Sequence, residues 1–438
     1  MRIVASTVAR ITSGNLVGPD SEAIGLSFDS RALVDGQMFV ALSGERDGHE
    51  FLQDALDRGA ACAIVEKGRA IAGLTCIEVE DTLIAIAQLA SALRESLTST
   101  VESRVVGITG SAGKTSTKDF VHAVLASTYF FTHSSTASLN NDIGVPATII
   151  NAPDSCDALV LEMGMRGFGE IARLCSIAQP CIGVVTNIGD AHSERVGGIG
   201  GVAKAKFELL QSLPHDGVAI VNADDSRSLD GARALKCQVV TFGESSVADV
   251  RWRVDGFDID GASNATFTYR GEEVAGLVLL PGQHMVANAA AAVAVGLSCG
   301  ISLSKCVAAL AAVKSQPGRM QWRQGRQGLR ILDDTYNANS LSMVSALRTL
   351  ARGGGRKIAV LGAMSEVADH EATHRAVAAE AHSLGIELLP CETELYGQPA
   401  LSIDDIVKHV SRIENVSVLV KGSRVAATER VVEKLLQL

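Results

Sequence analysis

The chain has 438 residues, a formal net charge of −10 and 47% hydrophobic side chains, a length that suggests about three domains with well-filled cores. The acidic balance, without any basic stretch interleaved with aromatic residues, argues against nucleic acid or an anionic membrane as a partner. Nine dispersed cysteines without a CxxC pair, and no apolar run long enough for a signal peptide or a membrane span, predict a reduced, cytoplasmic protein.

Residues 1–100 are predicted to form a small mixed α/β domain. Strands are expected at 38–42 and 62–65, and helices at 51–58 and 83–97. Polar turns such as 28–31 connect them, and taken alone these turns are ordinary solvated loops.

The segment 105–117, VVGITGSAGKTST, predicts a phosphate-binding loop. A buried parallel strand runs into a glycine turn, and a helix follows to about residue 126. Glycines let the backbone bend around an anion at a helix N-terminus, Lys114 can reach the outer phosphates, and the Thr115 hydroxyl can hold magnesium. The spacing is GxxGKT, shorter than the common GxxxxGK[ST] pattern. An ordinary glycine turn is therefore the alternative, but the strand, the triplet and the helix start together favour nucleotide binding.

The alternation of strands and helices continues through the second predicted domain, 101–317. Strands are expected at 158–163, 182–186 and 218–222, helices at 170–177, 201–213 and about 284–297, and an antiparallel flap at 250–280. Such alternation predicts a parallel sheet whose ligands collect at the carboxyl ends of the strands.

Two side chains in this domain are candidates for metal binding, and a third is a lysine in an unusual position. Glu162 ends a strand, and His192 lies in a loop after the next one; the alternatives are a solvated acid and a structural histidine. Lys206 shares a helical stripe with Val202 and Leu210 and so points towards the core, where a lysine is costly unless it is paired or modified. Lys204, two residues earlier, is expected on the surface.

Residues 318–438 predict a third, C-terminal α/β domain. Strands are expected at 331–334, 357–361 and 417–420, and helices at 340–350, 370–383 and 426–436. Asp334, Tyr336 and Asn337 follow the first of these strands and could bind a nucleoside, although an Asp/Asn run also simply caps a helix. The segment 421–424, KGSR, lies between a strand and a helix, which suits a carboxylate.

Five segments in this order resemble the Mur ligase family. They are TGSAGKTS at 109–116, SLNNDIGVP at 138–146, VAKAK at 202–206, DDTYNAN at 333–339 and VKGSR at 420–424. The chain departs from the family pattern at Ala137 and Ala363, where Gly and Asp are usual.

The resemblance implies a three-domain α/β fold: a UDP-substrate domain, a central ATPase domain with a mostly parallel sheet, and a Rossmann-like C-terminal domain. It implies a cytoplasmic, ATP-dependent amide ligase of cell-wall precursor synthesis, acting on UDP-N-acetylmuramoyl-tripeptide and D-alanyl-D-alanine through an acyl phosphate. We expect a monomer. The implied ATP contacts are Gly110, Ser111, Ala112, Gly113, Lys114, Thr115, Ser116, Asn288, Arg319, Asp334, Tyr336 and Asn337. The implied magnesium contacts are Thr115, Glu162, His192 and a Lys206 carbamylated by carbon dioxide, and the last three form the catalytic set with Lys114. The implied substrate contacts are Ser30, Arg31, Asn140, Asn141, Lys421 and Ser423.

Two kinds of protein compete with this interpretation. One is another ligase of the superfamily, either the one that adds the third peptide residue or a folylpolyglutamate synthase; the segments LNNDIGVP and DDTYNAN argue against both. The other is a nucleotide-binding regulatory protein without turnover, against which the full set of Lys114, Glu162, His192 and Lys206 argues. The identity of the third peptide residue, diaminopimelate or lysine, stays open.

Overall fold

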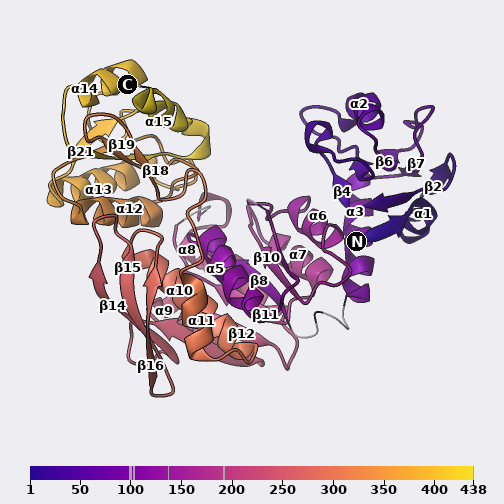
Figure 1. The fold of residues 1–438 in the computed structure, drawn as a ribbon, viewed down its shortest axis with the longest axis horizontal. Coiled ribbons are helices and arrows are strands. Elements are labelled where there is room, and N and C mark those ends of the chain that lie inside the picture. The colour runs from indigo at the N-terminus through magenta and orange to yellow at the C-terminus, as the bar shows by residue number, and fades with distance from the viewer. Residues whose placement is uncertain (98–100, 102–103, 137, 191–192, 438) are drawn as a thin grey trace.

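The computed structural model describes residues 1–97, 101, 104–136, 138–190 and 193–437. Within these residues the chain forms three units, which we name N-terminal, central and C-terminal after the sheet that each contains. The N-terminal and C-terminal units stand apart above the central unit, so that the molecule has the outline of an open V (Figure 1).

The N-terminal unit has a five-stranded sheet in the order β2-β7-β6-β5-β4 and a separate β1-β3 pair. Its strands are β1 (Arg2–Val4), β2 (Asn15–Val17), β3 (Glu22–Ile24), β4 (Leu26–Ser27), β5 (Met38–Val40), β6 (Cys62–Glu66) and β7 (Cys76–Val79). Its helices are α1 (Ala5–Thr12), α2 (Leu52–Asp57) and α3 (Thr82–Ser96).

The central unit has a nine-stranded sheet in the order β16-β15-β14-β13-β12-β11-β8-β10-β9, parallel from β9 to β14 and antiparallel beyond. Its strands are β8 (Val105–Thr109), β9 (Thr132–Ser134), β10 (Ala158–Glu162), β11 (Ile182–Val185), β12 (Val218–Asn222), β13 (Gln238–Gly243), β14 (Val250–Phe257), β15 (Ser263–Tyr269) and β16 (Glu272–Val278). Its helices are α5 (Lys114–Ala126), α6 (Gly144–Ile150), α7 (Glu170–Ala178), α8 (Ile199–Gln211), α9 (Ser226–Ala232), α10 (Gln283–Ser298) and α11 (Leu303–Leu310).

The C-terminal unit has a five-stranded sheet in the order β17-β18-β21-β19-β20, of which only β17 is antiparallel. Its strands are β17 (Gln321–Gln324), β18 (Arg330–Asp334), β19 (Arg356–Leu361), β20 (Glu387–Pro390) and β21 (Val416–Lys421). Its helices are α12 (Ser340–Arg352), α13 (His370–Ser383), α14 (Ile403–Val410) and α15 (Glu429–Leu436).

The central sheet is covered on both faces, and each cover continues into a neighbouring unit. Alternate residues of β8 point to opposite faces: Val106 and Ile108 pack with α5, α10 and residues of the C-terminal unit. Val105 packs instead with α6, α7, α8 and residues of the N-terminal unit. The sheet therefore connects two cores, and its carboxyl-terminal edge faces the space between the outer units.

The predicted fold class is confirmed: the chain is a multi-domain α/β protein with a large, mostly parallel central sheet. The domain limits at 100 and 317 stay predictions. The last helix begins at Glu429 rather than near 426, because Ala427 has a left-handed φ of 46° and interrupts the helical path. The predicted antiparallel flap is the edge of the central sheet, to which β14 is joined through β13. Among the described residues, none of the helices is both long and apolar enough to cross a membrane.

Candidate functional site

The predicted phosphate-binding loop, residues 110–113, lies between β8 and α5 at the carboxyl-terminal edge of the central sheet. We call it the ATP loop. Gly113, with φ of 81°, precedes the first residue of α5, and a Cβ there would lie 2.5 Å from Oδ1 of Asn288. Glycine is thus required both by the left-handed backbone and by the approach of α10. Lys114 Nζ donates to the carbonyl oxygen of Gly110 at 2.8 Å, which holds the lysine back across the loop.

A single asparagine after β11 clamps the middle of this loop. The Ala112 N–H donates to Oδ1 of Asn187 at 2.9 Å, and the Asn187 amide donates back to the Ala112 carbonyl at 3.1 Å. Thr186 Oγ1 donates to the same carbonyl at 2.6 Å. The strand that neighbours β8 therefore fixes the loop before any ligand arrives.

Two of the predicted metal ligands, Thr115 and Glu162, belong to one hydrogen-bond network. Thr115 Oγ1 donates to Oε2 of Glu162 at 2.8 Å, and the Asn140 amide donates to Oε1 of the same carboxylate at 2.8 Å. Arg319 reaches into the network from beyond α11, because its guanidinium donates to Ser138 Oγ at 2.7 Å. Glu162 is buried, so both carboxylate oxygens are held in fixed positions.

Two lysines face this network from different helices. Lys206, on α8, is 2% exposed, as the inward stripe with Val202 and Leu210 predicts. Burial holds the pKa of Lys206 well below its ordinary value, and the positive charge of Lys114 lowers it further. The pKa of Lys114 is also lowered, chiefly by burial, while the charges of Glu162 and Glu366 oppose this shift. Burial and the Lys114 charge together make the neutral amine of Lys206 more accessible than that of a lysine in water, while the charge of Glu366 opposes them.

The oxygen ligands suit a magnesium ion. Mg²⁺ prefers carboxylate and hydroxyl oxygens together with phosphates, and a paired Glu162 and Thr115 beside a phosphate loop supply the protein's share. Residues 191–192 lie outside the described residues, so the predicted contact by His192 stays a prediction. The residues described include no group of three or more His, Cys, Asp and Glu side chains that could hold a metal ion.

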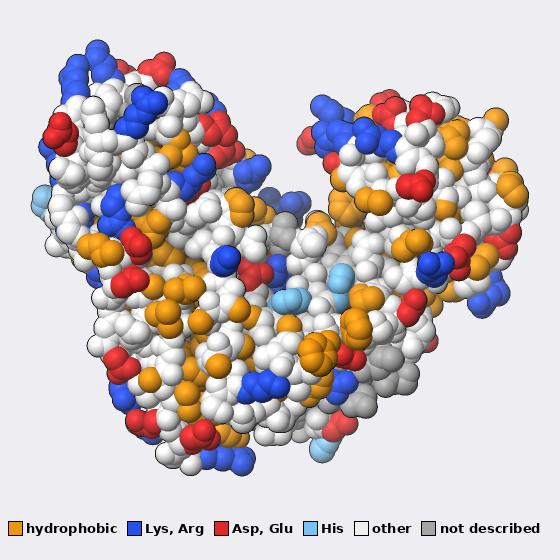
Figure 2. All heavy atoms as spheres, viewed as in Figure 1, with side chains coloured by type: hydrophobic (Ala, Val, Ile, Leu, Met, Phe, Trp, Pro, Cys, Tyr) orange, Lys and Arg blue, Asp and Glu red, His pale blue; other side chains and the backbone are white. Residues whose placement is uncertain are grey.

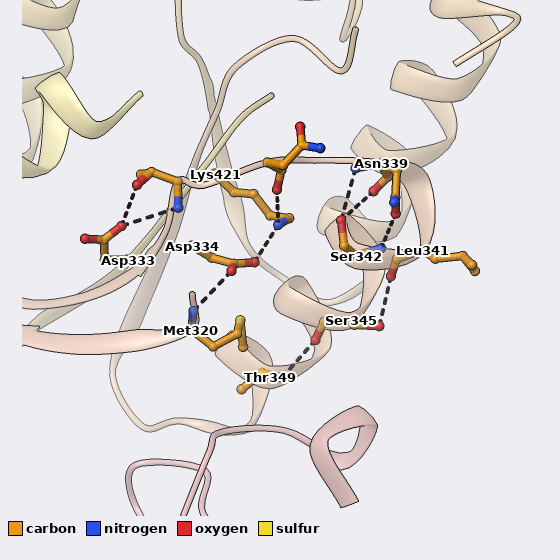
Figure 3. Close-up of polar contacts among 11 residues, drawn as sticks. Met320, Asp333, Asp334, Asn339, Leu341, Ser342, Ser345, Thr349 and Lys421 are labelled. Carbon is orange, nitrogen blue, oxygen red and sulfur yellow. Dashed lines mark hydrogen bonds and ion pairs between the residues drawn. The ribbon is translucent and has the colours of Figure 1, made fainter. Parts of the chain in front are cut away.

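The C-terminal unit presents a buried ion pair to the same region. Lys421 Nζ, 2% exposed on its side chain, donates to Oδ2 of Asp334 at 2.5 Å and to the Asn337 carbonyl at 2.8 Å (Figure 3). The Met320 N–H donates to the other Asp334 oxygen at 3.1 Å. Lys421 thus orders the Asp334–Asn337 turn, and the roles in ligand binding predicted for these residues stay predictions.

Other predicted site residues are held close to this turn or in the neighbouring loop. The Arg319 guanidinium stacks over the Tyr336 ring at 3.9 Å. Ser423, which is buried, donates through Oγ to the Ala363 carbonyl at 2.6 Å and joins the loops that follow β19 and β21. His284, at the start of α10, has its pKa lowered to about 4, mainly by burial, with Asp334 opposing and Lys421 adding to the shift.

The remaining predicted contacts lie apart from the ATP loop. Ser30 and Arg31 belong to the N-terminal unit, where the Arg31 side chain pairs with Asp29 at 2.8 Å. Asn141 caps α6 through the Gly144 N–H at 2.9 Å. The molecular surface is hollowed between the N-terminal and C-terminal units (Figure 2), so a long substrate could span from one to the other.

Several residues at the site are absent from the sequence-based predictions. Asn187, Thr186 and Ser138 hold the loop or its neighbours, and Asn339 and Glu366 come from the C-terminal unit. A strand end next to the phosphate-binding strand was a usable signal for Asn187. No local pattern points to Glu366.

Models of two families of domains match the chain. The Mur ligase middle domain matches residues 108–296, and the Mur ligase glutamate ligase domain matches residues 318–437. The first match covers the ATP loop, Glu162 and Lys206, and the second begins at Gly318, next to Arg319.

Similar proteins span the whole chain. A UDP-N-acetylmuramoyl-tripeptide–D-alanyl-D-alanine ligase of Escherichia coli (strain K12) is 35% identical over 99% of this chain and 98% of its own length. The ligase of that name in Bacillus subtilis (strain 168) is 36% identical over 84% of this chain and 79% of its own. A crystal structure of MurF from Acinetobacter baumannii has a TM-score of 0.89 at 29% identity and covers 100% of this chain and 99% of its own. MurF of Thermotoga maritima in complex with ADP has a TM-score of 0.78 at 28% identity, with 94% and 97% covered.

Proposed function

Because this chain belongs to the Mur ligase family, we propose that it joins D-alanyl-D-alanine to UDP-N-acetylmuramoyl-tripeptide, with ATP converted to ADP and phosphate. The observation that carries the proposal is that the ATP loop, the hydrogen-bonded Thr115–Glu162 pair and the buried Lys206 belong to the same region of the central unit. The chain also matches such ligases over its full length. The product is the pentapeptide precursor used in peptidoglycan synthesis, and hence in cell shape and division. The reaction takes place in the cytoplasm.

The first step activates the terminal carboxylate of the tripeptide. A carboxylate oxygen attacks the γ-phosphorus of ATP, the bond from that phosphorus to the β–γ bridging oxygen breaks, and ADP leaves. Lys114 and the N–H groups at the start of α5 stabilise the negative charge on the transferred phosphoryl group. The Asn187 clamp keeps those groups in place, so that little reorganisation is needed during the transfer.

The second step forms the amide. The amine of D-alanyl-D-alanine attacks the acyl phosphate carbon, a C–N bond forms, the amine loses a proton, and the C–O bond to phosphate breaks. An acyl phosphate hydrolyses readily, so the C-terminal unit must exclude water while it delivers the amine. In this proposal Lys421 and Ser423 serve the dipeptide by ordering the loops that receive it, and Ser30 and Arg31 bind the uridine end of the other substrate.

We assign Thr115, Glu162, His192 and a carbamylated Lys206 as the residues that would hold Mg²⁺, which would offset the charge of the ATP phosphates. Lys206 is 2% exposed as a whole residue, and its burial and the nearby Lys114 charge both disfavour the ammonium form. Addition of carbon dioxide to the neutral amine forms an N–C bond and releases a proton. The resulting carboxylate gives a buried lysine both a ligand role and a charge that suits the cation.

A phosphate-release assay tests the proposal. Phosphate should be released only when ATP, UDP-N-acetylmuramoyl-tripeptide and D-alanyl-D-alanine are all present. Parallel reactions with the diaminopimelate-containing and the lysine-containing tripeptide identify the third residue. Release without the dipeptide, or no release with either tripeptide, contradicts the proposal.

A further inference from the structure

The first turn of α12 contacts the ATP loop across the boundary between two units. The side-chain amide of Asn339, the residue before α12, donates through Nδ2 to the main-chain carbonyl of Ser111 at 3.0 Å. Both residues are buried, at 8% and 6% exposure. A buried hydrogen bond between residues 228 positions apart ties the C-terminal unit directly to the backbone that faces the phosphates.

The two residues that follow Asn339 extend this contact. Ser340 Oγ donates to Oδ1 of Asp190 at 2.6 Å, and the Leu341 side chain packs against Gly189. A Cβ at Gly189 would lie 2.3 Å from Cδ1 of Leu341, so any larger residue there would displace the Leu341 side chain from this contact. Three consecutive residues of the C-terminal unit are therefore seated on the ATP loop and its neighbouring segment.

One peptide group of the loop is held from both edges by different units. The Ser111 carbonyl and the Ala112 N–H belong to a single planar group. Asn339 binds the carbonyl and Asn187 accepts from the N–H, so the rotation of this plane depends on both. If the C-terminal unit moves away, the carbonyl loses its partner while the N–H keeps its own.

We propose that Asn339 is a positioning residue for nucleotide binding. When the C-terminal unit contacts the central unit, the Asn339 side chain orders the ATP loop by binding the Ser111 carbonyl. This inference rests on the proposed function for its choice of ligand. Because coupling between two binding events is reciprocal, nucleotide bound to the central unit favours the seated C-terminal unit by the same factor. The unit that delivers the amine is thereby drawn to the site when ATP is present.

Asn339 has a second task, which the experiment must separate from the first. Its Oδ1 accepts from the Ser342 N–H at 3.0 Å, and Ser342 Oγ accepts from the Asn339 N–H at 3.0 Å, forming the capping box of α12 (Figure 3). Asn339→Asp keeps an oxygen for the cap but replaces the donor to Ser111 with a second acceptor. Ser342→Ala weakens the cap and leaves the donor to Ser111 in place.

Calorimetric titration of the full-length variants with ADP is the test. We expect Asn339→Asp to bind ADP about tenfold more weakly than wild type, since a lost hydrogen bond and two facing acceptors are worth about that factor. Its KM for ATP should rise in proportion, while its affinity for UDP-N-acetylmuramoyl-tripeptide in the absence of nucleotide should not change. Ser342→Ala should bind ADP like wild type and unfold at a lower temperature.

Three outcomes would overturn the inference. The first is an Asn339→Asp variant that binds ADP within twofold of wild type. The second is a Ser342→Ala variant that weakens ADP binding as much as Asn339→Asp does, because the helix cap alone would then explain the effect. The third is a wild-type protein that binds no ADP, and this one contradicts the proposed function as well. The inference fails while the proposed function stands if the wild type binds ADP and releases phosphate only with the dipeptide, and Asn339→Asp behaves in the same way.

Discussion

Lys206 is the single residue whose chemistry depends most on its surroundings. Its side chain is buried in α8 and lies close enough to Lys114 for the two charges to oppose each other. If Lys206 carries the proposed carbamate, its replacement by alanine should lower the ligation rate about 100-fold or more, because the negative charge of the carbamate is lost from the reaction centre. Short carboxylates such as formate or acetate should restore part of the rate by occupying the vacated space.

Lys204 provides the matched control for this prediction. It lies on the same helix two residues earlier and is exposed, with its ammonium over the Phe168 ring at 5.5 Å. Lys204→Ala should keep wild-type kinetics. Full activity in Lys206→Ala would refute the carbamate. The carbamate would also be refuted if native mass spectrometry of the protein in carbonate buffer never showed the added mass of carbon dioxide.

His284 gives the site a defined response to acid. Its pKa falls from 6.5 to about 4, mainly through burial, so the folded state binds fewer protons here than the unfolded state. The contribution of His284 to stability is therefore complete above about pH 6.5 and is lost as the pH falls towards 4. In thermal unfolding, wild type should lose stability relative to His284→Gln between about pH 7.5 and pH 5. A gap between the two melting temperatures that does not change with pH contradicts this.

At the scale of elements, one carboxylate joins the two helices that flank the reaction centre. Glu208 of α8 accepts through Oε1 from the Gly169 N–H at 2.7 Å and through Oε2 from the Ala172 N–H at 3.1 Å, and so caps α7 from outside. Glu208→Ala should lower the free energy of unfolding by about 1.5–3 kcal/mol, as expected for charge-assisted bonds at a helix N-terminus. Glu208→Gln keeps one acceptor and should lose about half as much in urea unfolding. Equal stability of all three proteins would show that the cap contributes nothing.

Amphipathic helices and apolar strands were predictable from the sequence, and a short, fully buried helix was not. The stripe that turned Lys206 inward and the apolar strand that ends at Glu162 follow from side-chain spacing alone. All seven residues of α6 are buried, which removes the amphipathic period by which a helix is recognised. The bond from Asn339 to Ser111 joins residues 228 apart, and no local propensity encodes such a pairing.

At the scale of the whole molecule, the two outer units are attached to opposite faces of the central sheet. The N-terminal unit shares a continuous apolar core with one face of the central sheet, through α3 packed on α6 and α7. The C-terminal unit packs on the other face and adds polar contacts along the boundary, such as Trp322 Nε1 to the Asp260 carbonyl at 2.5 Å. Each outer unit is therefore held on its own face of the sheet by an apolar core together with polar contacts at the boundary.

Arg94 is one polar anchor of the N-terminal attachment and allows that attachment to be tested. It lies in α3 at 3% exposure and donates through Nε to the Ala178 carbonyl at 2.9 Å and through Nη2 to the Gln179 carbonyl at 3.3 Å. Arg94→Met fills similar space but leaves carbonyls at the end of α7 without these donors, which should cost about 2–4 kcal/mol of unfolding free energy. Arg10→Met, at an exposed position of α1, should cost almost nothing. Because these two Arg94 bonds end on carbonyls at the end of α7, Arg94→Met should lower the urea midpoint without changing KM for ATP. A rise in that KM would show that the N-terminal unit also governs the ATP loop.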